Sequence, residues 1–245
     1  MPSTLFNCLT AEPAAEARPE IITPLGTLSL DAEFDGIVIG DLKPSSAYRL
    51  EAGGLLFNWT LDGMVAELLL CRPRSLLAEH MAVTNCWAGI WRLRATVSTF
   101  PGERPEFSCC WEPGYQWTEG GPYSGEGLDA QTWEDSQTMV TLGTIDCEWL
   151  SGQAERGLHP SRWADLLGAS YGGIIPDTRN GRIDPIVYEK DGFRIVLPEL
   201  NADETCQVQF VAAWAPKTDD EMIDASTWYA ADQRPEDILS GAGCS

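Results

Sequence analysis

The sequence predicts a mainly β protein, an antiparallel β-sandwich with a few short helices. From residue 21 onward, short apolar stretches bounded by Gly, Pro, Asn or Asp recur along the chain, which is typical of a sandwich or barrel. Several stretches alternate apolar and polar residues, the period of a strand with one buried face. With 245 residues the chain is long enough to bury its own core.

The expected strands are short and follow one another closely. In residues 91–98, Trp91, Leu93 and Val97 point to one face and the even-numbered residues point to the other. Lys190-Asp-Gly192 indicates a hairpin, and Asn180-Gly181 indicates another tight turn. The expected strands lie within 23–34, 36–42, 47–59, 91–100, 106–111, 138–150, 184–189, 193–198 and 206–216.

Helical patterns are fewer. Residues 75–81 and 159–167 are typical of short helices, the second with Ser161 as its N-cap. A third helix is expected to start near Asp219. The apolar stretch 61–70 fits a short helix or a buried strand, and its periodicity does not decide between them.

The expected domain organisation has three parts. Residues 1–20, rich in Ala, Glu and Pro in their second half, are expected to form a flexible N-terminal arm. Residues 21–150 hold most of the strands and form a β-sandwich domain. After a polar stretch at 150–157, residues 151–245 form either a smaller β-rich subdomain or the completion of the same sandwich.

The chain is strongly acidic, with 37 Asp and Glu against 16 Lys and Arg and a formal net charge of −21 at pH 7. Nucleic-acid binding depends on clustered Lys and Arg that neutralise phosphates, so direct contact with DNA or RNA is disfavoured. An acidic surface suits a basic protein partner, or it keeps a concentrated protein in solution.

The eight cysteines are scattered at wide, irregular spacings, unlike the framework of small disulfide-stapled domains. We therefore expect all of them to be reduced. The N-terminus has no basic start and no apolar region, so no secretory signal is expected. No apolar run is long enough for a membrane span. We expect an intracellular, cytoplasmic location, with a virion or other particle as a further setting, and Asn58-Trp-Thr60 is then an accidental glycosylation sequon.

Two adjacent cysteines stand in the stretch FSCCWEPGYQW, residues 107–117. Neighbouring side chains on a strand point to opposite faces, so Cys109 and Cys110 are not expected to share a metal ion. We interpret the stretch as a buried wall of the sandwich and not as a reactive pair. Trp111 is expected on the same side as Cys109.

Other chemistry finds little support in the sequence, and neither a cofactor nor a metal is expected. His80 and His159 are the only histidines, and neither has a nucleophile motif beside it. The acidic loop 177–184 lacks the spacing of a calcium loop, and no glycine-rich nucleotide motif is present. Carboxylates among aromatic residues in 111–135 allow a sugar-binding or glycosidase site as an alternative.

Ten tryptophans are the remaining unusual feature. Trp supplies a large rigid contact area and one polar handle, which is why it is enriched in interfaces. Tryptophans in loops are better placed to meet a partner than those in strands. The partner-contact candidates are Trp117, Tyr123, Trp133, Glu119, Glu134 and Asp135.

One order of segments resembles the jelly-roll structural proteins of small viruses. Arg94-Ala-Thr-Val-Ser-Thr-Phe-Pro101, then Glu106–Trp111, a long loop, and Val140–Trp149 are similar to successive strands of those capsid-type proteins. The likeness covers about 60 residues and implies a jelly-roll-like sandwich with no catalytic residues. Genome-packaging shells usually carry a basic arm, whereas residues 1–20 contain a single basic residue, Arg18. The resemblance therefore implies an outer, decorating or RNA-independent shell component.

The sequence favours a non-enzymatic protein that acts by protein–protein contact, as a subunit or decorating component of a larger, virion-like assembly. One alternative is an acidic inhibitor of the immunity-protein kind, which neutralises a basic toxin or enzyme. Another is a small-molecule-binding β-barrel with cyclase-like or glycosidase-like activity. The expected partners are a protein or further copies of the chain, with a basic protein surface as one candidate.

Overall fold

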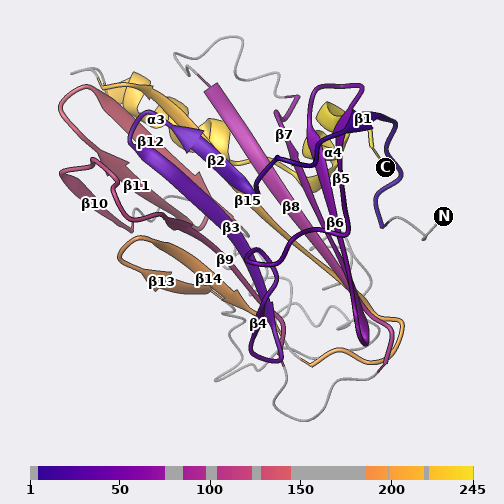
Figure 1. The fold of residues 1–245 in the computed structure, drawn as a ribbon. Coiled ribbons are helices and arrows are strands. Elements are labelled where there is room, and N and C mark those ends of the chain that lie inside the picture. The colour runs from indigo at the N-terminus through magenta and orange to yellow at the C-terminus, as the bar shows by residue number, and fades with distance from the viewer. Residues whose placement is uncertain are drawn as a thin grey trace, which may run out of the picture.

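The computed structural model describes residues 5–74, 85–97, 104–122, 128–144, 186–197, 199–217 and 221–244. Within these residues it confirms the antiparallel β-sandwich: two antiparallel sheets pack together, accompanied by two short helices (Figure 1). The described helices are not long and apolar enough to cross a membrane.

The larger sheet contains nine strands. Four of them, β5 to β8, are consecutive in the chain and form a meander, a simpler connection than the two Greek keys of a jelly roll. In spatial order the strands are β1 (Thr10–Pro13), β5 (Ser46–Leu50), β6 (Leu55–Leu61), β7 (Met64–Cys71), β8 (Asn85–Ala95), β15 (Thr205–Pro216), β12 (Thr138–Gly143), β11 (Ala130–Glu134) and β10 (Glu119–Pro122).

The smaller sheet contains six strands. Strand β3 (Gly26–Phe34) lies between β2 (Glu20–Thr23) and β9 (Glu106–Trp111), and it also pairs with the short β4 (Ile37–Val38). The hairpin of β13 (Ile186–Glu189) and β14 (Gly192–Val196) extends the sheet beyond β9. The expected turn at 190–192 is therefore confirmed.

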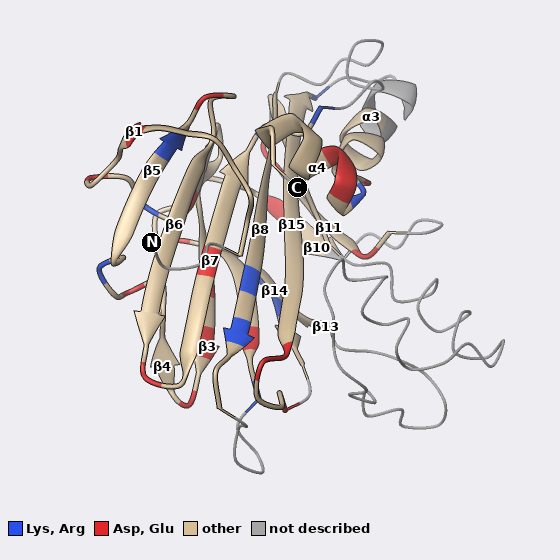
Figure 2. Cartoon of the chain, turned by 90° about the vertical axis from the view of Figure 1, so that its right-hand side faces the viewer, with Lys and Arg blue, Asp and Glu red and all other residues tan. Residues whose placement is uncertain are grey.

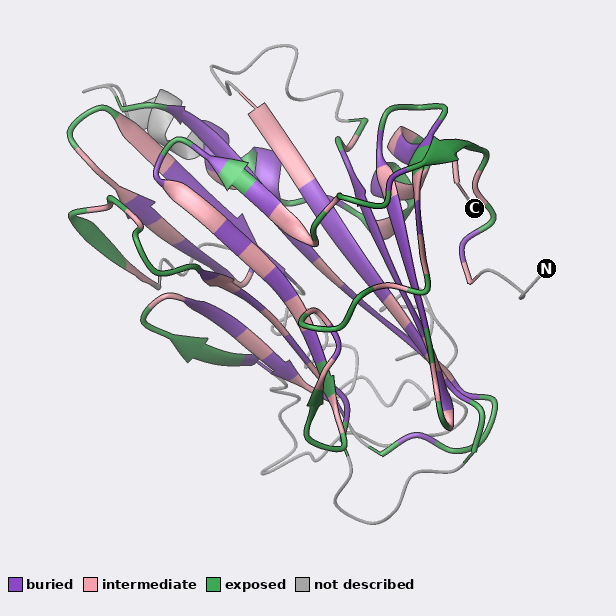
Figure 3. Ribbon diagram, in the orientation of Figure 1, coloured by how far each residue is buried: buried purple, intermediate pink, exposed green. Residues whose placement is uncertain are grey.

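The main core lies between the sheets, where buried residues follow the alternation of the strands (Figure 3). A row of aromatic rings runs through it: Trp59 and Trp91 have ring centroids 5.3 Å apart, and Trp91 and Phe107 are 6.4 Å apart. Trp91 and Leu93 face this core as expected, but Val97 is 58% exposed because β8 ends at Ala95.

The apolar stretch 61–70 is divided between two strands. Asp62 and Gly63 form the turn that joins β6 to β7, with Leu61 paired to Met64. Gly63 has φ +77°, a conformation that glycine adopts without steric cost. An Asp-Gly turn between apolar runs is a strong hairpin signal, so the strand alternative is correct.

Two helices cover the outer face of the larger sheet. Helix α3 (Glu221–Ala231) packs on β12 and β15, close to the start expected from the sequence, and its Thr227 hydroxyl lies 2.8 Å from that of Thr141 on β12. Helix α4 (Pro235–Ala242) packs on β7. The helices expected at 75–81 and 159–167 fall outside the described residues.

The N-terminal region differs from the flexible arm expected for residues 1–20. Phe6 is completely buried, residues 10–13 form β1 at one edge of the larger sheet, and β2 starts at Glu20. The Ala-, Glu- and Pro-rich composition did not indicate these contacts. A single buried aromatic ring and backbone pairing are enough to fix the segment.

The strands after residue 150 belong to the same two sheets as those before it. Strand β15 lies between β8 and β12 in the larger sheet, and β14 pairs with β9 in the smaller one. The described strands after residue 185 therefore belong to the same two sheets as the strands before residue 150. Residues 151–185 lie outside the described part of the chain.

One pair of cysteines departs from the expectation that all eight are reduced. Cys8 and Cys244 form a disulfide that joins the two ends of the chain. Irregular spacing gave no sign of this pair, because two residues 236 apart in sequence meet only in the finished fold. The other described cysteines are free: Cys71, Cys86, Cys109, Cys110 and Cys206.

Candidate partner-binding surface

The aromatic segment after β9 folds back against the protein. Trp117 is half-buried and stacks on Tyr115, with ring centroids 4.5 Å apart and an interplanar angle of 7°. The Lys190 ammonium lies 5.8 Å from the centre of the Trp117 ring on the hairpin side. Part of the Trp117 side chain is thus exposed to solvent, and the rest packs against the core of the chain.

Trp133, another candidate contact residue, lies in the core. Its exposed fraction is zero, its ring meets that of Trp111 edge to face at 5.6 Å, and its indole N–H donates to the Lys190 carbonyl at 3.3 Å. Its side chain does not reach the surface. It joins the larger sheet to the β13–β14 hairpin, and the sequence did not distinguish this role because Trp133 follows a polar, glycine-rich loop.

The acidic candidates at this end have different environments. Glu119 is exposed on the edge strand β10. Glu134 forms an ion pair with Lys217, and the Asp135 carboxylate accepts hydrogen bonds at 2.7 Å from the backbone N–H groups of Gln137 and Thr138. Asp135 therefore shapes the turn between β11 and β12. Tyr123 lies outside the described residues.

A more extensive surface lies on the outer face of the smaller sheet. Both described helices pack on the opposite side of the molecule, against the larger sheet (Figure 1). Residues on alternate positions of the smaller sheet point outward and keep part of their surface exposed. We call this surface the acidic face: it comprises Glu20, Ile22, Thr27, Ser29, Asp31, Glu33, Glu106, Ser108, Cys110, Val187, Glu189, Arg194 and Val196.

Carboxylates outnumber cations on the acidic face. Its single basic residue, Arg194, lies 2.8 Å from Glu106 and 3.2 Å from Glu189. The hydrogen bond that Arg194 donates to the Glu106 carboxylate is the main cause that raises the pKa of Arg194. In the part of the chain that the structure describes, Glu20, Asp31 and Glu33 form no ion pair, so the face has an excess of negative charge.

Asp31 is the least solvated carboxylate at the centre of this face. Burial raises its pKa, a hydrogen bond with Ser29 partly offsets this rise, and the charges of Asp41 and Glu112 raise it further. Like charges thus converge here without a compensating cation. Ser108 is the strand neighbour of Asp31 on β9, and the Gly40 backbone lies so close to the Asp31 carboxylate that a Cβ there would come within 1.9 Å of it.

Within the stretch 107–117, residues 107–111 form the expected wall of the sandwich, whereas residues 112–114 and 116 are exposed. Phe107, Cys109 and Trp111 are buried between the sheets, whereas Ser108 and Cys110 point outward. Burial raises the pKa of the Cys109 thiol well above its ordinary value. Burial and then the charges of Asp191 and Glu189 raise that of Cys110 to about 12. Neither thiol is activated for nucleophilic chemistry.

One group of side chains has the composition of a metal site. The Cys110 sulfur and carboxylate oxygens of Glu189 and Asp191 all lie within 4.8 Å of one another. A metal ion bound there would have to displace the proton of Cys110 and compete with Arg194 for Glu189. The arrangement thus carries no metal assignment, and the expected lack of a metal or cofactor stays a prediction.

Of the remaining candidates for chemistry, His80, His159 and the loop 177–184 lie outside the described residues. Asn58 of the sequon is buried at 4% exposure, and its amide donates to the Glu67 carboxylate at 2.7 Å. This asparagine is therefore closed to glycosylation in the folded protein.

No protein-family model matches the chain, and no curated protein matches its sequence significantly. The case for function therefore depends on the surface itself.

Proposed function

We propose that this protein is a non-enzymatic interaction protein that binds a basic protein surface through the acidic face. The observation that carries the proposal is the excess of carboxylates on an outer sheet surface that the described helices leave uncovered. Charged groups on a protein surface favour partners of opposite potential and accelerate their association. The same charge repels nucleic-acid phosphates, which supports a protein partner.

Within this proposal, we retain the role of a subunit or decorating component of a larger, virion-like assembly in the cytoplasm. A second copy of the chain would bring a second acidic face, and like charges across an interface are unfavourable. The acidic face therefore suits a different, basic component of such an assembly. It equally suits the alternative of an inhibitor that covers a basic active site.

The acidic face can be tested with a cationic probe. Titrating an oligo-arginine peptide into isotope-labelled protein should change the NMR chemical shifts of β2, β3, β9 and β14 more than those of β5 to β8. An oligo-glutamate peptide serves as the control. Changes centred on β10 and β11, or spread evenly over the surface, would contradict the proposal.

A further inference from the structure

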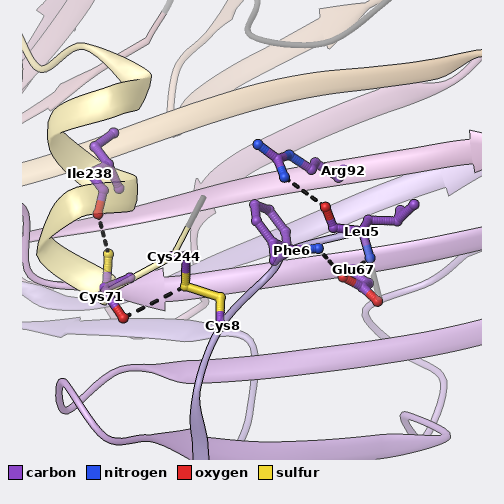
Figure 4. The surroundings of a disulfide bond; sticks show 9 residues. Leu5, Phe6, Cys8, Glu67, Cys71, Arg92, Ile238 and Cys244 are labelled. Atoms are coloured by element: carbon purple, nitrogen blue, oxygen red, sulfur yellow. Dashed lines mark hydrogen bonds between the residues drawn. A yellow bond between two sulfur atoms is a disulfide. The ribbon is translucent and has the colours of Figure 1, made fainter. Parts of the chain in front are cut away.

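The disulfide joins two segments that lie on the outer face of the larger sheet (Figure 4). Cys8 belongs to the N-terminal segment, and Cys244 follows helix α4. Both cysteines are half-buried, and their neighbours Leu9 and Gly243 are exposed. A small reductant can therefore reach the bond.

Polar contacts hold the N-terminal side of this junction without the help of the disulfide. The Glu67 carboxylate accepts hydrogen bonds from the backbone N–H groups of Leu5 and Phe6, at 2.7 and 2.9 Å. The Arg92 guanidinium donates to the Leu5 carbonyl at 2.7 Å and lies 4.2 Å from the centre of the Phe6 ring. With Phe6 completely buried, this segment has several independent anchors.

The helical side has fewer anchors. Helix α4 has eight residues, of which Ile238 and Ala242 are buried. The Cys71 thiol of β7 donates a weak hydrogen bond to the Ile238 carbonyl at 3.5 Å. Backbone contacts add to this: the Arg74 N–H donates to the Asp237 carbonyl at 3.5 Å, and Cys8 and Cys244 pair as an isolated β-bridge. An isolated helix of this length is not stable in water, so the position of α4 depends on these few contacts and on the covalent bond that follows it.

We propose that Cys8–Cys244 is a redox clasp whose reduction releases α4 from the larger sheet while the N-terminal segment stays bound. The reductant is a dithiol or a pair of monothiols, which supplies two electrons and two protons. The S–S bond breaks, Cys8 and Cys244 become thiols, and the reductant becomes a disulfide. This device acts on the face opposite the acidic face and does not depend on the proposed function.

Release of α4 changes the surface of the protein. Ile238 and Ala242 belong to a second apolar core on the outer face of the larger sheet, together with Leu50, Leu56, Leu69, Cys71, Ile90 and Val211. Without α4, part of this cluster faces solvent. Disulfides are rare in reducing compartments and are commonly redox-active where they occur there. A reversible bond is therefore compatible with the cytoplasmic location that the sequence predicts.

Three free thiols, of which Cys71 and Cys206 are buried and Cys86 is half-buried, report on three separate parts of the structure. Cys71 lies beneath α4, and burial raises its pKa to about 12. Cys86 donates to the Ala230 carbonyl of α3 at 3.4 Å, and its pKa is also raised to about 12, mainly by burial. Cys206 lies in the core between the sheets. Alkylation of each thiol therefore measures a different opening.

The experiment compares oxidised protein with protein that has been reduced by dithiothreitol. The dithiothreitol is then removed under anaerobic conditions. Both samples receive a pulse of iodoacetamide, and mass spectrometry quantifies each cysteine. Reduction should accelerate the labelling of Cys71 by about tenfold or more, since local opening governs the reactivity of a buried group. Cys86 and Cys206 should keep their rates, because α3 and the main core stay closed.

Two variants test the same release without a reductant. Cys8→Ser removes the bond. Cys71 of this variant should be alkylated at the same rate as Cys71 of the reduced protein. A Cβ at Gly241 would lie 2.5 Å from the Arg72 carbonyl oxygen, so Gly241→Ala should push α4 outward and accelerate Cys71 labelling in oxidised protein. Ser240→Ala, at an exposed position of the same helix, is the matched control and should have no effect.

The outcomes separate a local clasp from other behaviour. If Cys71 stays as slow as Cys206 after reduction and in Cys8→Ser, α4 does not depend on the bond and the proposal is wrong. If Cys71, Cys86 and Cys206 all accelerate together, reduction loosens the whole fold, which also overturns a local release. Acceleration of Cys71 alone supports it.

Discussion

The outer face of the larger sheet carries α3, α4 and the N-terminal segment, whereas no helix in the described part of the chain packs on the outer face of the smaller sheet. Polar groups on the two faces differ accordingly. On the larger sheet, Glu67 has an exposed fraction of zero and binds three donors. On the smaller sheet, Glu33 is exposed and forms no ion pair among the described residues.

This difference separates charges that maintain the fold from charges that are available to a partner. Figure 2 shows the larger sheet side, with a red band on β7 and blue bands on β8. Strand β7 contains Glu67, and β8 contains Arg92 and Arg94. The charges of Glu67 and Arg92 attract each other and fix the N-terminal segment. On the acidic face, Glu106 and Glu189 pair with Arg194, whereas Glu20 and Glu33 form no ion pair among the described residues. These two carboxylates support a role in recognition.

The largest expected effect compares the same substitution on the two faces. Glu67→Ala leaves two buried backbone N–H groups and the Asn58 amide without their acceptor and leaves Arg92 without its counter-charge. Its free energy of unfolding should fall by about 3 kcal/mol, as for other broken buried charge networks. Glu33→Ala removes an exposed carboxylate and should change it by about 0.5 kcal/mol or less.

Urea denaturation of the two variants at pH 7 measures this difference. Equal losses of stability would show that the carboxylates of both faces are structural, and the comparison would fail. Glu119→Ala, on the exposed edge strand β10, offers a second reference and should behave like Glu33→Ala.

A smaller effect concerns pH and the centre of the acidic face. The pKa of Asp31 is raised in the folded protein, mainly by burial, so the folded state prefers the protonated carboxyl. The associated stability is fully present below the unfolded pKa and is lost as pH rises through the folded pKa. Asp31→Asn cannot ionise and should therefore be more stable than the parent protein at pH 7.

Denaturation curves from acid to neutral pH check this sign. The advantage of Asp31→Asn should shrink as pH falls and vanish below the unfolded pKa of an aspartate, about 4. Glu33→Gln, at an exposed position of the same strand, is the matched control. An advantage of Asp31→Asn that persists at acid pH would show that packing, and not charge, causes it.

Local patterns in the sequence were sufficient to predict the class of fold. Alternation identified the strands around Trp91 and Cys109, and Lys190-Asp-Gly192 marked a true hairpin. These features depend on neighbours along the chain. The position of β15 between β8 and β12, and the Cys8–Cys244 bond, depend on contacts between distant segments and left no local pattern.

The candidate surface was harder to predict for the same reason. Loop position suggested Trp133 as a contact residue, but its ring fills the core between the sheets. The acidic face has a signal in the sequence, since Ser29, Asp31 and Glu33 alternate with apolar residues in one strand and Glu106, Ser108 and Cys110 in another. Only the pairing of β3 with β9 brings these two rows together.

The most direct test of the central claim compares two charge-reversed variants of equal net charge. One replaces Glu20, Glu33 and Glu189 on the acidic face with Lys. The other replaces the exposed Glu12, Glu51 and Asp62, which belong to the larger sheet and its turns, with Lys. Affinity for the oligo-arginine peptide is measured by calorimetry at low and moderate salt. The account predicts that the first variant loses binding and the second keeps most of it. Equal losses would show that binding follows net charge alone, and the acidic face would have no special role.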